Sequence, residues 1–183
     1  MLRLQRGLVV AVAIQLNCGC VKLALPNGRV VDILTPVLDE IAKWLQVSPD
    51  TPEGGGYIVG YEHRDTGNVV LEKVSVPHRL DRRTRTHFDL LDPAHKFFLR
   101  KEKFRKSFYM GVWHTHPQVT PTPSATDWDD WEKTLEFDKT ACDYIFFLIS
   151  GTDSTRVWVG NLQSKAIEEI FECPKVNGLY VVQ

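Results

Sequence analysis

An unbroken apolar run in the last quarter of the chain is the feature that most constrains its fold. Residues 143–150 read DYIFFLIS, without polar alternation from Tyr144 to Ile149. A strand with one solvated face alternates apolar and polar side chains, whereas a continuous apolar run is typical of a strand covered on both faces. Such a strand needs other elements on each side of its sheet. The sequence therefore predicts a layered α/β domain around a central sheet.

Periodicity and turn residues place the other elements of this domain. Strands are predicted at 21–25, 30–31, 57–63, 69–76, 108–116 and 155–161, with turns at Pro26-Asn27-Gly28 and Asp65–Asn68. Helices are predicted at 35–45, 92–105 and 124–137, with Thr35, Asp92 and Ser124 as N-caps. The polar segment 77–88 is predicted to be irregular, and the tail from Lys165 to combine short strands with irregular pieces.

Length and composition limit the class of protein. A chain of 183 residues corresponds to about one domain, and 43% apolar with 25% charged residues are globular values. No apolar run approaches the ~20 residues of a membrane span. The net charge of −1 gives no overall attraction to nucleic acid or to anionic membranes. We therefore expect no membrane association and no nucleic-acid partner.

The N-terminus and the cysteines bear on the cellular compartment. Arg3 and Arg6 precede a short apolar stretch at 7–13, as in a signal peptide, but no A-x-A site follows and residues 8–14 also suit a buried strand. Four cysteines are too few for a disulfide scaffold: Cys18, Cys20, Cys142 and Cys173. The C-x-C pair is typical of two small thiols rather than a metal or redox site. We expect a cytoplasmic protein, with export as the alternative.

Residues 111–127, GVWHTHPQVTPTPSATD, carry the strongest chemical signal. His114 and His116 are two residues apart, so on an extended segment both imidazoles point to the same face. Asp127 follows Ser124 by three residues and falls in the first turn of the predicted helix. Two imidazoles and one carboxylate leave a fourth tetrahedral position open, as in a catalytic zinc site. A bare H-x-H would more commonly be a surface or packed pair, but the full string is far more specific.

This pattern resembles the JAMM, or MPN-plus, metalloproteases. Their signature combines H-[ST]-H-P and S-x-x-D, which match His114–Pro117 and Ser124–Asp127, with an upstream E-x-G-G-x-[LIV]-x-G, which matches Glu53–Gly60. The resemblance covers roughly residues 30–162. It implies a mixed central sheet flanked by helices, similar to the layered architecture of cytidine deaminases. It also implies a single JAMM/MPN catalytic domain over residues 1–183 with an N-terminal strand extension at about 1–29.

The resemblance assigns a role to each matching residue. It implies that His114, His116 and Asp127 hold one Zn²⁺ per chain and that Glu53 is the general base and acid. A glutamate can take a proton from a zinc-activated water and pass it to the leaving amine. Ser124 would donate to the oxyanion of the tetrahedral intermediate, as in the family, and it is also the expected N-cap. A surface glutamate in a Gly-rich turn is the alternative for Glu53.

Two further features allow both a structural and a functional interpretation. Trp113, Trp128 and Trp131 crowd the motif; aromatic residues at i, i+3 on a helix usually belong to a core, and a substrate channel is the alternative. Residues 79–106 carry ten basic and four acidic side chains, a balance of +6. That segment is either a solvated face or a docking surface for an acidic partner protein.

The predicted function is zinc-dependent isopeptidase activity. The resemblance implies cleavage after the C-terminal glycine of a ubiquitin-like protein or its conjugate. The sequence is also similar to stand-alone bacterial members of antiphage operons, which work beside E1-like and E2-like partners and reverse conjugation. The alternative is a binding scaffold of the same fold without catalysis, which the intact motif disfavours.

Overall fold

The computed structural model of the protein describes residues 19–138, 143–176 and 179–180. The N-terminal segment that suggested a signal peptide or a strand lies outside these residues, as do Cys18 and Cys142. Cys20 is a free thiol. None of the described helices is both long enough and apolar enough to cross a membrane.

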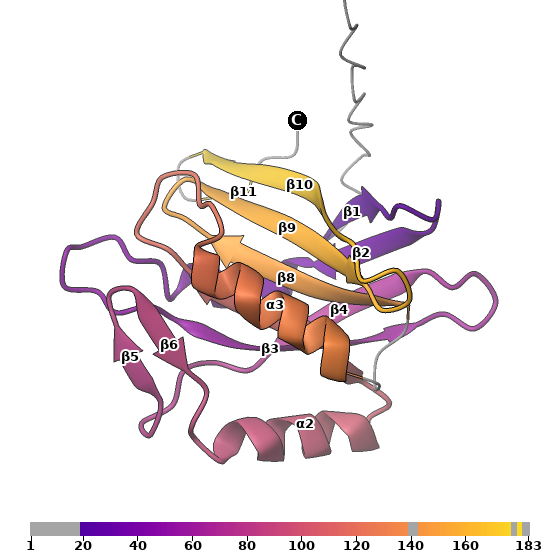
Figure 1. Cartoon of the computed structure of the whole chain (residues 1–183), viewed down its shortest axis with the longest axis horizontal. Coiled ribbons are helices and arrows are strands. Elements are labelled where there is room, and N and C mark those ends of the chain that lie inside the picture. The colour runs from indigo at the N-terminus through magenta and orange to yellow at the C-terminus, as the bar shows by residue number, and fades with distance from the viewer. Residues whose placement is uncertain (1–18, 139–142, 177–178, 181–183) are drawn as a thin grey trace, which may run out of the picture.

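A curved nine-stranded mixed sheet forms the centre of the described structure (Figure 1). Its strands run in the order β1 (Cys20–Ala24), β2 (Val30–Leu34), β4 (Val69–Val74), β3 (Gly55–Glu62), β7 (Phe108–Thr115), β8 (Tyr144–Ser150), β9 (Ser154–Asn161), β10 (Ile167–Val176) and β11 (Leu179–Tyr180). The pairs β2/β4 and β7/β8 are parallel, and the other neighbours are antiparallel. The sheet curls until β1 contacts β10. The predicted mixed sheet is thus confirmed.

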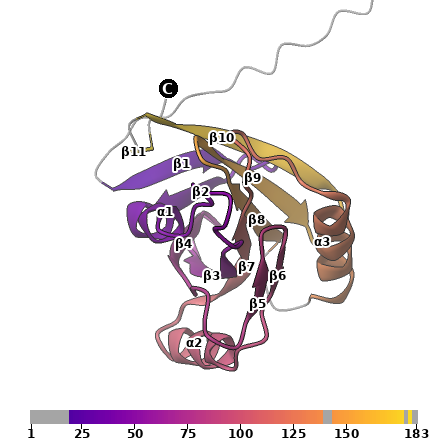
Figure 2. The same ribbon diagram turned by 90° about the vertical axis from the view of Figure 1, so that its left-hand side faces the viewer.

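Strand β8 explains why the sheet has helices on both faces. All seven of its residues are buried. Phe146 and Leu148 belong to the core that includes α1 (Thr35–Ala42), whereas Ile145, Phe147 and Ile149 belong to a second core under α3 (Ala125–Phe137). Figure 2 shows α1 and α3 on opposite sides of the sheet. The continuous apolar run therefore supplies alternate side chains to two cores, as predicted.

The third helix, α2 (Ala94–Phe104), contacts β3 and β7 and lies below the sheet in the view of Figure 1. Two predicted caps differ from the structure. Thr35 is the first residue of α1 rather than its N-cap, which is Leu34 and has no capping side chain. Asp92 lies one residue before the N-cap Pro93 of α2, yet its Oδ1 accepts a hydrogen bond from Ala94 N at 2.9 Å. The two helix starts differ from the prediction by one residue in opposite directions, a normal variation at helix ends.

The segment 77–88 was predicted to be irregular, and this prediction is wrong. It contains most of a hairpin of β5 (Arg82–Thr84) and β6 (His87–Asp89), which pair antiparallel. Its charged residues hid the strands from apolar periodicity, because the hairpin is held by polar contacts such as the Arg82–Asp89 ion pair. The hairpin lies beside the start of β3 (Figure 2). Its base is tied to the sheet through buried His95, which contacts Asp81 and Ser75 at 2.9 Å each.

The tail also departs from its prediction. Residues 167–176 form one long strand, β10, rather than short pieces. A register shift between Glu169 and Phe171 interrupts its pairing with β9. This bulge adds one residue to the strand, so the side chains after it point to the face opposite to the one that regular alternation would give. The sequence therefore lacks the alternation by which a strand is recognised.

Candidate metal centre

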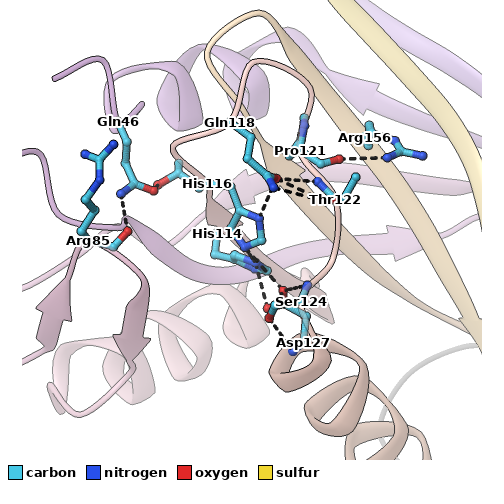
Figure 3. Close-up of polar contacts among 11 residues, drawn as sticks. Gln46, Arg85, His114, His116, Gln118, Pro121, Thr122, Ser124, Asp127 and Arg156 are labelled. Atoms are coloured by element: carbon cyan, nitrogen blue, oxygen red, sulfur yellow. Dashed lines mark hydrogen bonds and ion pairs between the residues drawn. The ribbon is translucent and has the colours of Figure 1, made fainter. Parts of the chain in front are cut away.

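The two motif histidines lie where β7 leaves the sheet. His114 is in the strand and pairs with Gly55 of β3 and Ile149 of β8, while His116 follows the strand and donates its backbone N–H to Ser150 O at 3.0 Å. Because alternate residues share a face, both rings point the same way. Their Nε2 atoms are 3.0 Å apart (Figure 3). The predicted convergence of the imidazoles is what the structure shows.

Asp127 reaches this point from the first turn of α3. A reciprocal capping box fixes its carboxylate: Ser124 Oγ accepts from Asp127 N, and Asp127 Oδ2 accepts from Ser124 N at 2.6 Å. Asp127 Oδ1 lies 3.1 Å from His114 Nε2, and Oδ2 lies 3.4 Å from His116 Nε2. The S-x-x-D spacing therefore begins the helix and also aims a carboxylate at both imidazoles.

Glu53 comes from the residues just before β3, the strand that pairs with β7. It is buried, with 7% of its surface exposed, and one ligand atom from each of Glu53, His114 and His116 lies within 4.8 Å of the others. The glycines that follow Glu53 allow neighbouring residues to approach the backbone closely. A Cβ at Gly55 would come within 2.6 Å of the Phe88 ring, and one at Gly56 within 2.1 Å of a backbone oxygen. Glycine at positions 55 and 56 is thus required by the close approach of Phe88 and Ser75 to the start of β3.

These four side chains fit a metal ion. Nitrogen ligands that bind zinc at about 2.0–2.1 Å in a tetrahedral arrangement lie roughly 3.4 Å apart. The separations among His114, His116 and Asp127 are 3.0 to 3.4 Å. Imidazole and carboxylate donors also suit zinc. The geometry leaves one choice open, because either Asp127 or Glu53 could be the third ligand beside the histidines.

The electrostatics separate the two carboxylates. Burial is the main effect on Glu53 and raises its pKa, although the nearby histidines oppose it. Burial also acts to raise the pKa of Asp127, but hydrogen bonds from His114, His116 and Ser124 outweigh it and hold this pKa far below its usual range. Two carboxylates with pKa values pushed in opposite directions are typical of sites that divide proton transfer from charge stabilisation. Here Glu53 is the better proton acceptor.

The Ser124 hydroxyl already has a partner. Its Oγ donates to Asp127 Oδ2 at 2.7 Å while accepting from Asp127 N at 3.2 Å. A hydroxyl has one proton to donate, so a hydrogen bond to a substrate oxyanion requires Ser124 to redirect that proton from Asp127. The N-cap role is confirmed by the capping box. The oxyanion role stays a prediction.

Sequence reasoning missed several residues that support the site. Thr115, between the histidines, points to the other face, accepts from Gly54 N at 2.9 Å and donates to buried Gln46 at 3.3 Å. Gln118 Oε1 lies 3.4 Å from His116 Nδ1 and accepts from Thr122 N, as Figure 3 shows. The alternation of the strand could have indicated the direction of Thr115. The long-range partners have no sequence signal.

A pocket of about 530 Å³ opens over these residues. One wall comes from 86–90 in and after the β5–β6 turn, and the other from 122–134 on α3 and the loop before it. His87 lies in this wall and pairs with Asp89 at 2.9 Å. The hairpin that sequence periodicity missed is therefore part of the site.

The tryptophans mainly form core. Trp113 and Trp131 are buried, and Trp131 stacks on Phe147 with ring centroids 4.6 Å apart. Both also line the pocket, whereas Trp128 is partly exposed and packs edge-on against Trp131. The core interpretation is confirmed for two of the three.

Comparison with known proteins identifies relatives of the chain. Residues 34–161 match the family described as prokaryotic homologs of the JAB domain. A protein of Vibrio cholerae named CD-NTase/cGAS isopeptidase is 31% identical over 141 residues, which cover 75% of this chain and 85% of that protein. A Pseudomonas aeruginosa protein of the same name is 27% identical over 110 residues, covering 58% and 68%.

The fold has a counterpart among solved structures. Protein DSY2949 of Desulfitobacterium hafniense superposes with a TM-score of 0.51 at 22% identity, over 75% of this chain and 87% of that chain. At this identity the likeness concerns the fold alone.

Proposed function

This chain belongs to the family of prokaryotic JAB-domain homologues, and from that premise we propose that it is a zinc-dependent isopeptidase. The proposal rests on one observation above all. Four side chains converge in a single pocket: His114 in β7, His116 just after it, Asp127 in α3 and Glu53 just before β3. A scaffold without catalysis has no need for a buried glutamate beside two imidazoles and a carboxylate.

The proposed substrate follows from the relatives. Two similar proteins are named CD-NTase/cGAS isopeptidase. We propose that this chain hydrolyses the bond between the C-terminal glycine of a ubiquitin-like protein, or of a nucleotidyltransferase conjugated in the same way, and a lysine amine. Its setting would be a bacterial antiphage conjugation system with E1-like and E2-like partners. We propose a cytoplasmic location, consistent with the free thiol of Cys20.

Each side chain has a defined part in the proposed reaction. His114, His116 and Asp127 would hold the zinc ion, which would supply polarisation of the scissile carbonyl and acidification of a water. Glu53 takes a proton from the attacking water, for which its raised pKa and burial suit it, and then delivers that proton to the leaving amine. Ser124 turns its hydroxyl from Asp127 to the oxygen of the tetrahedral intermediate.

The test is a paired measurement of zinc content and cleavage for wild type and Glu53→Gln. Glutamine preserves size but cannot accept the proton, so we expect zinc to stay at one per chain while turnover falls roughly 10²–10⁴-fold. The substrate is a ubiquitin-like domain fused through its C-terminal glycine to a reporter. Substrate binding should survive.

Glu62→Gln is the matched control. Glu62 lies at the other end of β3, seven residues from Gly55 and thus roughly 20 Å along the strand. Its loss should leave cleavage unchanged, because Glu62 lies far from the pocket. Asp65 follows Glu62 in the next turn, so we do not expect it to replace Glu53 as the base either. Full activity in Glu53→Gln would remove Glu53 from the mechanism. Loss of zinc with activity would make Glu53 a ligand and Asp127 a supporting residue, and zinc-free, inactive wild type would favour the scaffold.

A further inference from the structure

The backbone of Glu53 is held by two consecutive residues of the β5–β6 hairpin. Glu53 N–H donates to Thr84 O at 2.7 Å. Arg83 Nε donates to Glu53 O at 2.7 Å, and its Nη2 donates to Pro52 O at 3.3 Å. Both peptide groups that flank Glu53 are therefore fixed by β5, which lies thirty residues further along the chain.

Arg83 is itself oriented for this task. Its guanidinium lies over the Trp44 ring, with the central carbon 5.1 Å from the ring centroid. Cation–π attraction to the indole favours this position, and the planar guanidinium presents its N–H groups in a fork that a lysine ammonium cannot reproduce. Two of those groups meet two successive carbonyl oxygens. The side chain thus acts as a rigid bracket between Trp44 and residues 52–53.

Sheet contacts reach Gly54 but stop one residue short of Glu53. Gly54 N–H donates to Thr115 Oγ1 and Gly54 O accepts from Thr115 N, both at 2.9 Å, whereas the described backbone hydrogen bonds of Glu53 itself go to the hairpin. The first ladder pair of β3 with β7 is Gly55 with His114, two residues after Glu53. Three glycines follow, and a glycine-rich segment has more backbone conformations available than any other. A general base has to lie within about half an ångström of its productive position. Burial alone does not set that position.

We propose that Arg83 is the positioning residue for Glu53, acting through the carbonyl oxygens of Pro52 and Glu53 without touching substrate or metal ligands. This inference rests on the proposed role of Glu53 as general base. Loss of the bracket should lower kcat by about 10- to 100-fold, because a displacement near 1 Å of a catalytic group has an effect of that size. KM and zinc content should change little. Among the described residues, the hydrogen bonds of Arg83 go to the backbone oxygens of Pro52 and Glu53, and none goes to His114, His116 or Asp127.

The experiment compares Arg83→Ala and Arg83→Lys with Arg85→Ala. Arg85 is the matched control because it lies on the same hairpin and also donates to two loop carbonyls, Ser48 O at 2.9 Å and Pro49 O at 2.6 Å, which do not adjoin Glu53. Each protein is assayed for zinc, kcat and KM on the fusion substrate. Millimolar methylguanidine is added to test chemical rescue of Arg83→Ala.

A second measurement does not depend on activity. Hydrogen exchange of the Glu53 amide is followed in zinc-free protein, since that amide donates to Thr84 O. We expect faster exchange in Arg83→Ala but not in Arg85→Ala. We also expect a lowered kcat in Arg83→Lys, and partial recovery of Arg83→Ala by methylguanidine.

Two results would overturn the inference. One is wild-type kcat and wild-type Glu53 exchange in Arg83→Ala; the other is an equal loss in Arg83→Ala and Arg85→Ala, which would show general tethering of the hairpin. Failure of the proposed function looks different, because Glu53→Gln would then be as active as wild type. In that case the exchange measurement still decides whether Arg83 positions Glu53.

Discussion

Contacts of different range hold two parts of the site: His114, His116 and Asp127, called here the ligand side, and the neighbouring Glu53, called the Glu53 side. On the ligand side, strand alternation aligns the histidines, and a capping box between residues three positions apart aims Asp127. On the Glu53 side, the decisive hydrogen bonds join residues separated by 30 and 61 positions. A short motif can encode the first arrangement. The second exists only after the hairpin, β3 and β7 have assembled.

The largest effect on zinc content and cleavage should come from removing the proposed histidine ligands. His114→Ala with His116→Ala removes both imidazoles, so we expect zinc content to fall from one per chain to near zero and cleavage to reach background. The Glu53 side should remain formed, because its contacts involve neither ring. Metal analysis and exchange of the Glu53 amide check the two statements separately. Unchanged zinc in the double variant would contradict the ligand assignment.

Ser124 tests whether one residue on the ligand side has two tasks. Ser124→Ala removes the cap and the donor, so we expect a loss of about 0.5–2 kcal/mol in unfolding free energy and a fall in kcat of roughly 10²–10³-fold. Glycine is nearly as good an N-cap, so Ser124→Gly should keep most of the stability and still lose the rate. Denaturant unfolding and steady-state kinetics separate these effects. A Ser124→Gly enzyme with normal kcat would leave Ser124 as a cap only.

Substitution of Asp81 tests the base of the β5–β6 hairpin, which holds the backbone of Glu53. Its buried carboxylate accepts from the backbone N–H of His78, Leu91 and Asp92 and from His95 Nε2. Asp81→Asn turns an acceptor into a donor that faces N–H groups, so we expect a loss of about 1–3 kcal/mol in unfolding free energy. Zinc content should not change. Denaturant unfolding measures the loss, with exposed Asp129→Asn as the control.

The same carboxylate predicts a pH dependence. Burial acts to raise the pKa of Asp81, but the hydrogen bonds it accepts outweigh this and lower it below its ordinary value of 3.8. The folded state therefore gains stability from Asp81 above that ordinary value and loses it as pH falls through the lower, folded pKa. Wild type should lose stability below about pH 4, and Asp81→Asn should show a shallower slope over that range. Equal slopes would contradict this account.

The smallest effect concerns a surface outside both parts of the site. Helix α2 exposes Lys96, Arg100, Lys101 and Lys103 together with Phe97 and Phe104, which are 66% and 85% exposed. If this surface docks an acidic partner, Arg100→Glu with Lys103→Glu should raise KM for a protein substrate several-fold, most strongly at low salt. A short peptide that carries only the scissile tail should be cleaved normally.

The control for α2 is Lys43→Glu with Arg64→Glu, which changes the net charge equally at exposed positions elsewhere. A similar rise in KM in the control would indicate overall charge rather than docking. Equal loss on peptide and protein would mean that α2 supports folding or the site itself.

The contrast between the two sides also explains what the sequence could predict. His114, His116, Ser124 and Asp127 could be placed because strand alternation and helix capping act over three residues or fewer. The run at 143–150 predicted a sheet covered on both faces because burial leaves a continuous apolar pattern. The position of Glu53 in the pocket came from the family's glycine string, not from any local rule.

What the sequence did not predict depends on long-range polar contacts. The β5–β6 hairpin is rich in arginine, so it has no apolar periodicity, and its partners Glu53 and Gln46 lie thirty or more residues away. Strand β10 was missed because a bulge breaks its alternation. Thr115 matches the H-[ST]-H-P motif, but its role depends on Gly54 and Gln46, which only the fold brings beside it.

The pairing of Gly55 with His114 has a consequence for how the protein matures. A strand shifted by one residue turns every side chain to the opposite face. In β7 such a slip would direct Thr115 into the pocket and both imidazoles toward Gln46, leaving no pair of nitrogens to chelate an ion. In the proposed zinc enzyme, metal binding would therefore depend on strand alignment, and zinc would select correctly aligned molecules from a newly synthesised population by mass action.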